Sequence, residues 1–356
     1  MKKIIILLLC AVLVLGAFSA CKKANPPSSQ SPGASQSPGA SPPAESNAAI
    51  AKTGLAVISS VAKSTPAGSE DGVAQADSLA VAVLVGNDGK ILACSIDSAQ
   101  SKINFTAEGK LKTDKATTFK SKQELKEEYG MKKASKIGKE WNEQADAFAK
   151  YVVGKSADEV KGIAVSDEGY ATAPDLTSSV TIHVTDFISA VEKAVTNAKD
   201  LGAKNTDKLG LAISTEMSKS KDATAEEAGL AEAYSTYSVV TTDTSGKISS
   251  CYIDGSLSDV NFDTKGAITS DIKAAPKTKQ ELKEEYGMKK ASKIGKEWFE
   301  QADAFAAYVK GKSPDEVKKI AVSDQGYASD ADLISSVTIH IGPLMAIVEK
   351  AASNAK

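Results

Sequence analysis

The amino-acid sequence predicts an α+β fold made of two duplicated domains, each a small antiparallel β-sheet packed with several helices and a C-terminal helix. One observation behind this prediction is the stretch KQELKEEYGMKKASKIGKEW, which occurs unchanged at residues 122–141 and 279–298. Another is a constant offset of 157 positions, which relates Cys94 to Cys251 and His183 to His340. In each copy, strand-like runs are followed by capped helical segments. Two copies of so long a unit indicate duplicated domains, each large enough to bury a core.

The chain begins with a pattern that is typical of an export signal. Two lysines precede an apolar run and small residues, in MKKIIILLLCAVLVLGAFSAC, so residues 1–20 are predicted to be a signal peptide. The end of this run, from Phe18 to Cys21, resembles the lipobox of bacterial lipoproteins, and this implies that Cys21 is lipidated. We therefore expect an exported protein, lipid-anchored to the outer face of the bacterial cytoplasmic membrane. Ordinary secretion, with cleavage near Ala20, is the alternative.

A linker separates this segment from the repeats. Residues 21–48 hold the lipidated cysteine and a stretch dominated by Pro, Ser, Gly and Ala, a composition that cannot bury a core and is typical of a solvated tether. The two repeats are assigned to residues 49–201 and 202–356. Because the register between them is constant, we expect residues 202–356 to fold alone and to unfold cooperatively.

Each repeat is predicted to open with a short helical segment, followed by a β-hairpin. The helical segments are GLAVISSVAKS and GLAISTEMSKS. Asp88-Gly89 and Ser245-Gly246 are turn signals between apolar, strand-like runs. A further strand is expected at residues 103–105 and 260–262.

The rest of each repeat is predicted to be helical. Ser/Thr-x-x-Glu capping boxes begin short helices at Ser121, Thr278, Ser156 and Ser313. Gly130 and Gly287 are placed to end the first of these helices in each repeat. A longer helix shows one apolar face, formed by Trp141, Ala145, Phe148 and Val152. The terminal helix is expected to have Thr185 or Gly342 as its N-cap, with Pro343 at the first helical position.

Composition and motifs exclude several classes of function. The formal net charge is −2, and all 43 basic residues are lysines, so the planar arginine contacts that recognise phosphates and guanine are absent. We expect no nucleic-acid partner. The chain also contains no HExxH, GxSxG, P-loop or nucleotide-type GxGxxG pattern, and we do not expect an enzyme.

The cysteines of the two repeats occupy equivalent positions. Cys94 and Cys251 each lie within a strand-like run and have no CxxC partner or metal-ligand spacing. Buried free thiols are the favoured interpretation, and a single disulfide is the alternative. A nucleophilic pair of Cys94 with His183 is conceivable, but no local pattern supports it.

The last part of each repeat resembles the FMN-binding domains of exported bacterial redox lipoproteins. The resemblance is carried by LTSSVTIHVTDFISAVEKA, LISSVTIHIGPLMAIVEKA and the hairpin run NDGKILACSID. In that family a Ser-Gly-Ala-Thr-x-Thr/Ser motif precedes the last helix, and its final hydroxyl carries FMN through a phosphoester. Here Ser179 and Val180 replace the glycine and alanine of the motif, and His183 and His340 stand at the acceptor position. No cofactor is certain from this resemblance, and FMN is implied only in a non-covalent form.

We expect any ligand to bind between the SSVTIH segment, taken as a strand, and the YGMK corner of each repeat. A helix N-terminus, a histidine and an aromatic cluster converge there. The alternatives are that Thr181 and His183 end a buried strand, with the imidazole bonded to a backbone carbonyl, and that Trp141 is simply a core residue. The candidate cofactor-binding residues are Thr181, His183, Tyr129, Met131 and Trp141 in the first repeat, and Thr338, His340, Tyr286, Met288 and Trp298 in the second.

Two functions are compatible with the sequence. The first is a membrane-anchored extracytoplasmic lipoprotein whose tandem domains bind a small flavin-type ligand or serve an envelope redox partner. The second is a non-catalytic cell-envelope protein that binds another protein or a wall polymer. Flavin that co-purifies with the folded protein would distinguish the first from the second.

Overall fold

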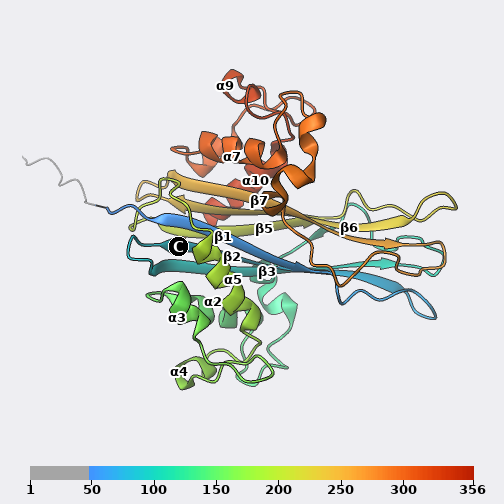
Figure 1. The fold of residues 1–356 in the computed structure, drawn as a ribbon, viewed down its shortest axis with the longest axis horizontal. Helices are drawn as coiled ribbons and strands as arrows, with labels where there is room; N and C mark the ends of the chain where they lie inside the picture. The colour runs from blue at the N-terminus through green and yellow to red at the C-terminus, as the bar shows by residue number, and fades with distance from the viewer. Residues whose placement is uncertain (1–47) are drawn as a thin grey trace, which may run out of the picture. The chain divides into compact units, whose positions relative to one another are not determined.

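The computed structural model describes residues 48–356, which contain two antiparallel sheets and their helices (Figure 1). This mixed α+β architecture confirms the predicted fold class. The first repeat forms β1 (Lys52–Ser60), β2 (Gly72–Val85), β3 (Ile91–Phe105), β4 (Thr118–Phe119), α1 (Lys122–Leu125), η1 (Lys126–Tyr129), α2 (Trp141–Val152), α3 (Ala157–Lys161), α4 (Pro174–Thr177) and α5 (Thr185–Thr196). The second forms β5 (Lys208–Glu216), β6 (Gly229–Thr242), β7 (Ile248–Phe262), α6 (Lys279–Leu282), η2 (Lys283–Tyr286), η3 (Met288–Lys290), α7 (Trp298–Tyr308), α8 (Pro314–Lys318), α9 (Ala331–Ile334) and α10 (Gly342–Ser353).

The predicted opening helices are wrong, because these segments are the strands β1 and β5. Each pairs antiparallel with the following strand, from Lys52 opposite Val85 to Ser60 opposite Asp77 in the first repeat. Three consecutive residues of β1, Leu55, Ala56 and Val57, are almost fully buried. Side chains of a strand alternate between two faces, so consecutive burial means that both faces of the sheet are covered. The expected short strands at residues 103–105 and 260–262 are the ends of the long strands β3 and β7.

One face of each sheet is covered by the helices of its own repeat. Helix α5 packs on β1 and β2, and α2 packs on β3; α10 and α7 make the same contacts in the second repeat. Figure 1 shows these helices on the outer sides of the two sheets. A Cβ at Gly54 would lie 2.0 Å from the Ala194 carbonyl oxygen, so glycine is what allows α5 to approach β1 so closely.

The other face of each sheet packs against the sheet of the other repeat. Two buried clusters contain side chains from both sheets, and one of them includes the stacked rings of Phe105 and Phe262, with centroids 4.2 Å apart. The ion pairs across this contact are reciprocal: Lys193 binds Glu281, and Lys350 binds Glu124. The two sheets therefore form an internal pseudo-two-fold contact, and Asn47–Lys356 is one compact unit.

The local helix signals agree closely with the structure. All four predicted capping boxes are present, and Gly130 and Gly287 adopt left-handed conformations at the ends of η1 and η2. The predicted apolar face of α2 is buried throughout. One prediction is wrong by a single residue: Val184 and Ile341 are the N-caps of α5 and α10, so Thr185 and Gly342 are already helical and Pro343 comes second. In residues 48–356, no helix is both long and apolar enough to span a membrane.

Candidate functional site

In the first repeat, four of the five predicted site residues line one cavity of about 370 Å³, the first pocket. Tyr129 comes from η1, Met131 from the loop after it, Trp141 from the start of α2, and His183 from the segment before α5. Strands β1, β2 and β3 supply the opposite wall, and the first turn of α5 borders the cavity through Asp186 and Phe187. The convergence expected from the sequence is therefore present. Trp141 also packs in the core, so it is both a core residue and a pocket wall.

The histidines do not end a buried strand. The SSVTIH segment is not a strand; it touches Tyr170 through a single isolated β-bridge at His183. The imidazole is exposed and lies against the Tyr170 ring, with centroids 4.1 Å apart, and Tyr327 and His340 repeat this pair. The expected alternative of a histidine buried at a strand end is thus wrong. An exposed imidazole at the pocket rim remains free to contact a ligand.

Thr181 and Thr338 lie behind the pockets and not in their walls. The Thr181 main-chain N–H and hydroxyl both donate to Oε1 of Gln144, at 2.8 and 3.2 Å. Gln144 is fully buried on α2 and also donates to the Lys139 carbonyl. Thr338 and Gln301 form the same links in the second repeat. These threonines therefore fix the histidine segment to α2. The signal that could have revealed this was a glutamine on an otherwise apolar helix face.

The second repeat has an equivalent cavity of about 500 Å³, the second pocket. Tyr286, Trp298 and His340 line it, as predicted, whereas Met288 packs against the core beside it. Its wall is otherwise different. Tyr234 and Leu257 stand where the first pocket has Asp77 and Gln100, and Pro343 and Leu344 stand where it has Asp186 and Phe187. The wall of the second pocket is consequently more apolar.

The sequence interpretation missed one lysine in each site, Lys122 in the first and Lys279 in the second. Nζ of Lys122 lies 4.7 Å from the Tyr129 ring centroid and 5.0 Å from that of Trp141. Lys279 lies at 4.8 and 4.9 Å from Tyr286 and Trp298. A cation held between two aromatic faces is stabilised by the ring quadrupoles. Each lysine is the first residue of the repeated block, and this position was the available signal.

A buried aspartate on the sheet holds each lysine-bearing helix in place. Oδ1 of Asp97 accepts from the main-chain N–H groups of Ser98 and Gln123, at 2.7 and 3.0 Å. The Gln123 side chain donates to the Ile96 carbonyl and to Asp146. The equivalent Asp254 and Gln280 make the same bonds. The identical block is thus a helical lid, fastened to β3 or β7 by an Asp–Gln clamp.

Electrostatics differ between the two pockets. In the first pocket, Asp77 forms an ion pair with Lys63 at 3.1 Å. Burial of Asp77 raises its pKa, but hydrogen bonds from Gln100 and Gln75 outweigh this effect, so the pKa of Asp77 is lowered overall. In the second, burial raises the pKa of Glu232, and the nearby Asp259 adds to this effect. Burial also lowers the pKa of Lys279 to about 8. The first pocket therefore holds balanced charges, and the second holds a poorly solvated amine.

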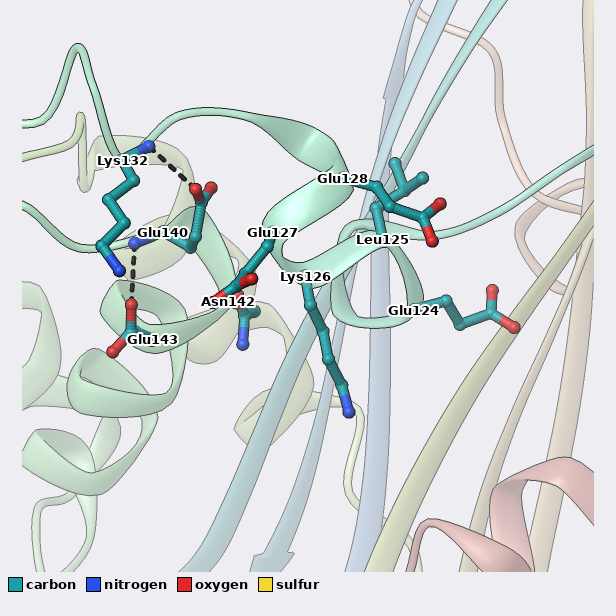
Figure 2. A pocket seen from close by; sticks show the side chains of 9 residues that line it. All are labelled: Glu124, Leu125, Lys126, Glu127, Glu128, Lys132, Glu140, Asn142 and Glu143. Atoms are coloured by element: carbon teal, nitrogen blue, oxygen red, sulfur yellow. Dashed lines mark hydrogen bonds between the residues drawn. The ribbon is translucent and has the colours of Figure 1, made fainter.

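A further cavity, of about 510 Å³, lies outside the lid and is rich in glutamates (Figure 2). Its most buried member, Glu140, accepts from the main-chain N–H groups of Met131 and Lys132, at 2.8 and 3.0 Å. Figure 2 shows that carboxylate turned toward Lys132 and the Glu140 N–H bonded to Glu143. The carboxylate thus closes the loop that carries Met131, and the cavity has no aromatic wall. By holding this loop, the Glu140 carboxylate supports the wall of the first pocket.

Cys94 and Cys251 are free, as favoured from the sequence; Cys251 is buried and Cys94 is partly buried. Burial raises the pKa of both thiols, that of Cys251 to about 12, so a nucleophilic thiolate is not available at either position. Within residues 48–356, no group of three or more His, Cys, Asp or Glu side chains could hold a metal ion. The chain matches no family model, no curated protein and no solved structure.

Proposed function

We propose that the protein is an extracytoplasmic lipoprotein whose two repeats each bind one flat, ring-bearing ligand of the flavin type without a covalent bond. The observation that carries the proposal is the recurrence of one constellation: a lysine ammonium between a tyrosine and a tryptophan, with a histidine at the rim. The constellation is assembled from the lid, from α2 or α7, and from the segment before the last helix. Volumes of about 370 and 500 Å³ are in the range of small-molecule sites.

The constellation has the chemistry that such a ligand needs. Apolar ring surface can lie along the Tyr and Trp side chains, while the ammonium is directed at an electron-rich carbonyl or an anionic group of the ligand. The first turn of α5 borders the first pocket, and free main-chain N–H groups at a helix N-terminus favour a phosphate. Because a histidine stands at the acceptor position of the family motif, we propose non-covalent binding.

The two tryptophans provide the test. The chain has only two, Trp141 and Trp298, and each lines one pocket. Two single variants, Trp298→Phe and Trp141→Phe, each keep one tryptophan. Titration of FMN into each variant should quench the fluorescence of the remaining indole saturably, so that each pocket is measured separately. Lys122→Met or Lys279→Met, which keep the chain length and remove the charge, should weaken binding at that pocket alone by about 10-fold, since a cation contact is worth about 1–2 kcal/mol.

The histidines supply a second test of the proposal. His183→Ala and His340→Ala should weaken FMN binding by about 5-fold and leave the melting temperature unchanged, because both side chains are exposed. Absence of indole quenching at millimolar FMN in the folded wild-type protein would refute the proposal. A loss of stability without a loss of binding would remove the histidines from the site.

The proposed membrane anchor falls on Cys21, outside the described residues. Cys21→Ser should move the protein from the membrane fraction to the medium, because removal of the acyl attachment leaves no lipid to hold it. Cell fractionation and immunoblotting measure this, with Cys10→Ser as the control that keeps the lipidation position. A Cys21→Ser protein that stays in the membrane fraction would contradict lipid anchoring.

A further inference from the structure

Lys279 in the second pocket is more deeply buried than Lys122, its counterpart in the first pocket. Only 5% of its surface is exposed, and its Nζ lies 4.4 Å from the centroid of a third ring, Tyr234, in addition to Tyr286 and Trp298. The ammonium donates to the Tyr234 hydroxyl at 3.2 Å. Within the described part of the chain, no carboxylate forms an ion pair with it, although Glu232 and Asp254 lie near enough to favour its charged form. The amine is therefore poorly solvated and weakly paired.

A lysine in such surroundings loses its proton more easily and becomes a nucleophile. Burial is the main cause that lowers the pKa of Lys279 from 10.5 to about 8. At pH 7 the neutral fraction is then on the order of 100-fold larger than that of a solvated lysine. Lys279 also lines the second pocket, so its amine faces a cavity of about 500 Å³ and not a closed core. Desolvated lysines of this kind are the ones that attack carbonyl groups.

We propose that the second pocket binds small aldehydes or ketones covalently, as an imine on the Lys279 amine. The neutral nitrogen attacks the carbonyl carbon and forms a C–N bond, while the carbonyl π electrons go to the oxygen and one amine proton is transferred to it. The second amine proton leaves with that oxygen as water, which gives the C=N bond; water reverses the step, so no oxidant or reductant is required. Glu232, 9% exposed in the pocket wall, and the Tyr234 hydroxyl are the groups placed to move the proton. This inference does not depend on flavin binding.

The first pocket is a built-in comparison. Lys122 has the same following residues as Lys279, because both begin the repeated block. Among the described residues, the rings that its Nζ faces are those of Tyr129 and Trp141. Asp77 and Gln75 stand where Tyr234 and Glu232 stand in the second repeat. Lys122 is also only half-buried. It therefore tests whether enclosure, and not local sequence, makes the amine reactive.

The experiment uses benzaldehyde as the carbonyl probe and cyanoborohydride to trap the imine on the intact protein at pH 7. Trypsin does not cut at a benzylated lysine, so Lys122 is read in residues 121–126 and Lys279 in residues 278–283. These two peptides differ by Ser against Thr at the first position and are resolved by mass spectrometry. Lys279 should be labelled at least about 10-fold faster than Lys122, and faster than the exposed lysines.

The pH profile separates a reactive amine from a merely accessible one. The rate at Lys279 should level off near pH 8, whereas the rates at exposed lysines continue to rise. The titratable groups that face or line the site are Glu216, Lys219, Glu232, Tyr234, Asp254, Tyr286 and His340. Tyr234→Phe should slow labelling at Lys279 and leave Lys122 unchanged. If the labelling rates of the lysines simply follow their solvent exposure, with Lys279 among the slowest, the proposal is overturned. This result is obtained with the wild-type protein and is independent of the FMN titration.

Discussion

Residues 49–201 and 202–356, produced separately, should each self-associate and should form a 1:1 complex when they are mixed. Each half alone exposes the sheet face that the other half covers in the intact protein. Tyr237 and Ala80 hold equivalent places in the two repeats, and both are fully buried in the cluster between the sheets. Two second halves would place Tyr237 against its own copy and overpack the contact, whereas two first halves would leave space. The mixed complex should therefore be preferred.

Analytical ultracentrifugation and native mass spectrometry of the halves, alone and mixed, measure this result. The control is the second half carrying Phe262→Ala, mixed with the wild-type first half. Loss of the ring that stacks on Phe105, with centroids 4.2 Å apart, should reduce the free energy of association by about 3–5 kcal/mol. That cost weakens the complex by about 100- to 4,000-fold. The sequence predicted that residues 202–356 fold alone, and the shared clusters change the expected state from an isolated to an associated one. A soluble, monomeric, cooperatively unfolding second half would contradict this expectation.

The protein should become more stable as the pH falls from 7.5 to 5. Burial raises the pKa of Asp97 to about 6 and that of Asp254 to about 7, both from 3.8. In this range the folded state binds protons that the unfolded state does not bind, so stability is lost as the pH rises through these values. The expected gain on acidification is about 1 kcal/mol from Asp97 and about 2–3 kcal/mol from Asp254. Carboxylates with lowered pKa values, such as Glu124 and Glu281, oppose the trend only at lower pH.

Asparagine at both positions should flatten this pH dependence. The amide oxygen still accepts the two main-chain hydrogen bonds that Oδ1 of Asp97 accepts, at 2.7 and 3.0 Å, but no charge is buried. Asp97→Asn with Asp254→Asn should therefore match or exceed the wild type at pH 7.5. Asp254→Ala is the contrasting variant, because the Gln280 N–H loses its acceptor and the lid loosens. Urea unfolding between pH 5 and 8 measures these differences, and a wild type that loses stability steadily below pH 7.5 would exclude this account.

The sequence by itself determined the features that depend on short-range interactions. Capping boxes at Ser121 and Ser313, the turn at Gly89 and the apolar face of α2 were all correct, because each is set by residues within one or two turns of one another. The hairpin turn signals also predicted the antiparallel sheets, and the sequence placed Tyr129 and His183 at one site beside the last helix.

Only the tertiary structure decided the rest, because it depends on contacts between distant segments. An apolar run such as β1 has no single periodicity when both of its faces are covered, so the run resembled a helix until β2 and the opposite sheet were in place. Burial of Lys279 likewise requires Tyr234 from β6 and Trp298 from α7 at the same point. Desolvation is a property of the surrounding atoms and not of the lysine's own sequence, and so two identical blocks produce one half-exposed cation and one enclosed amine.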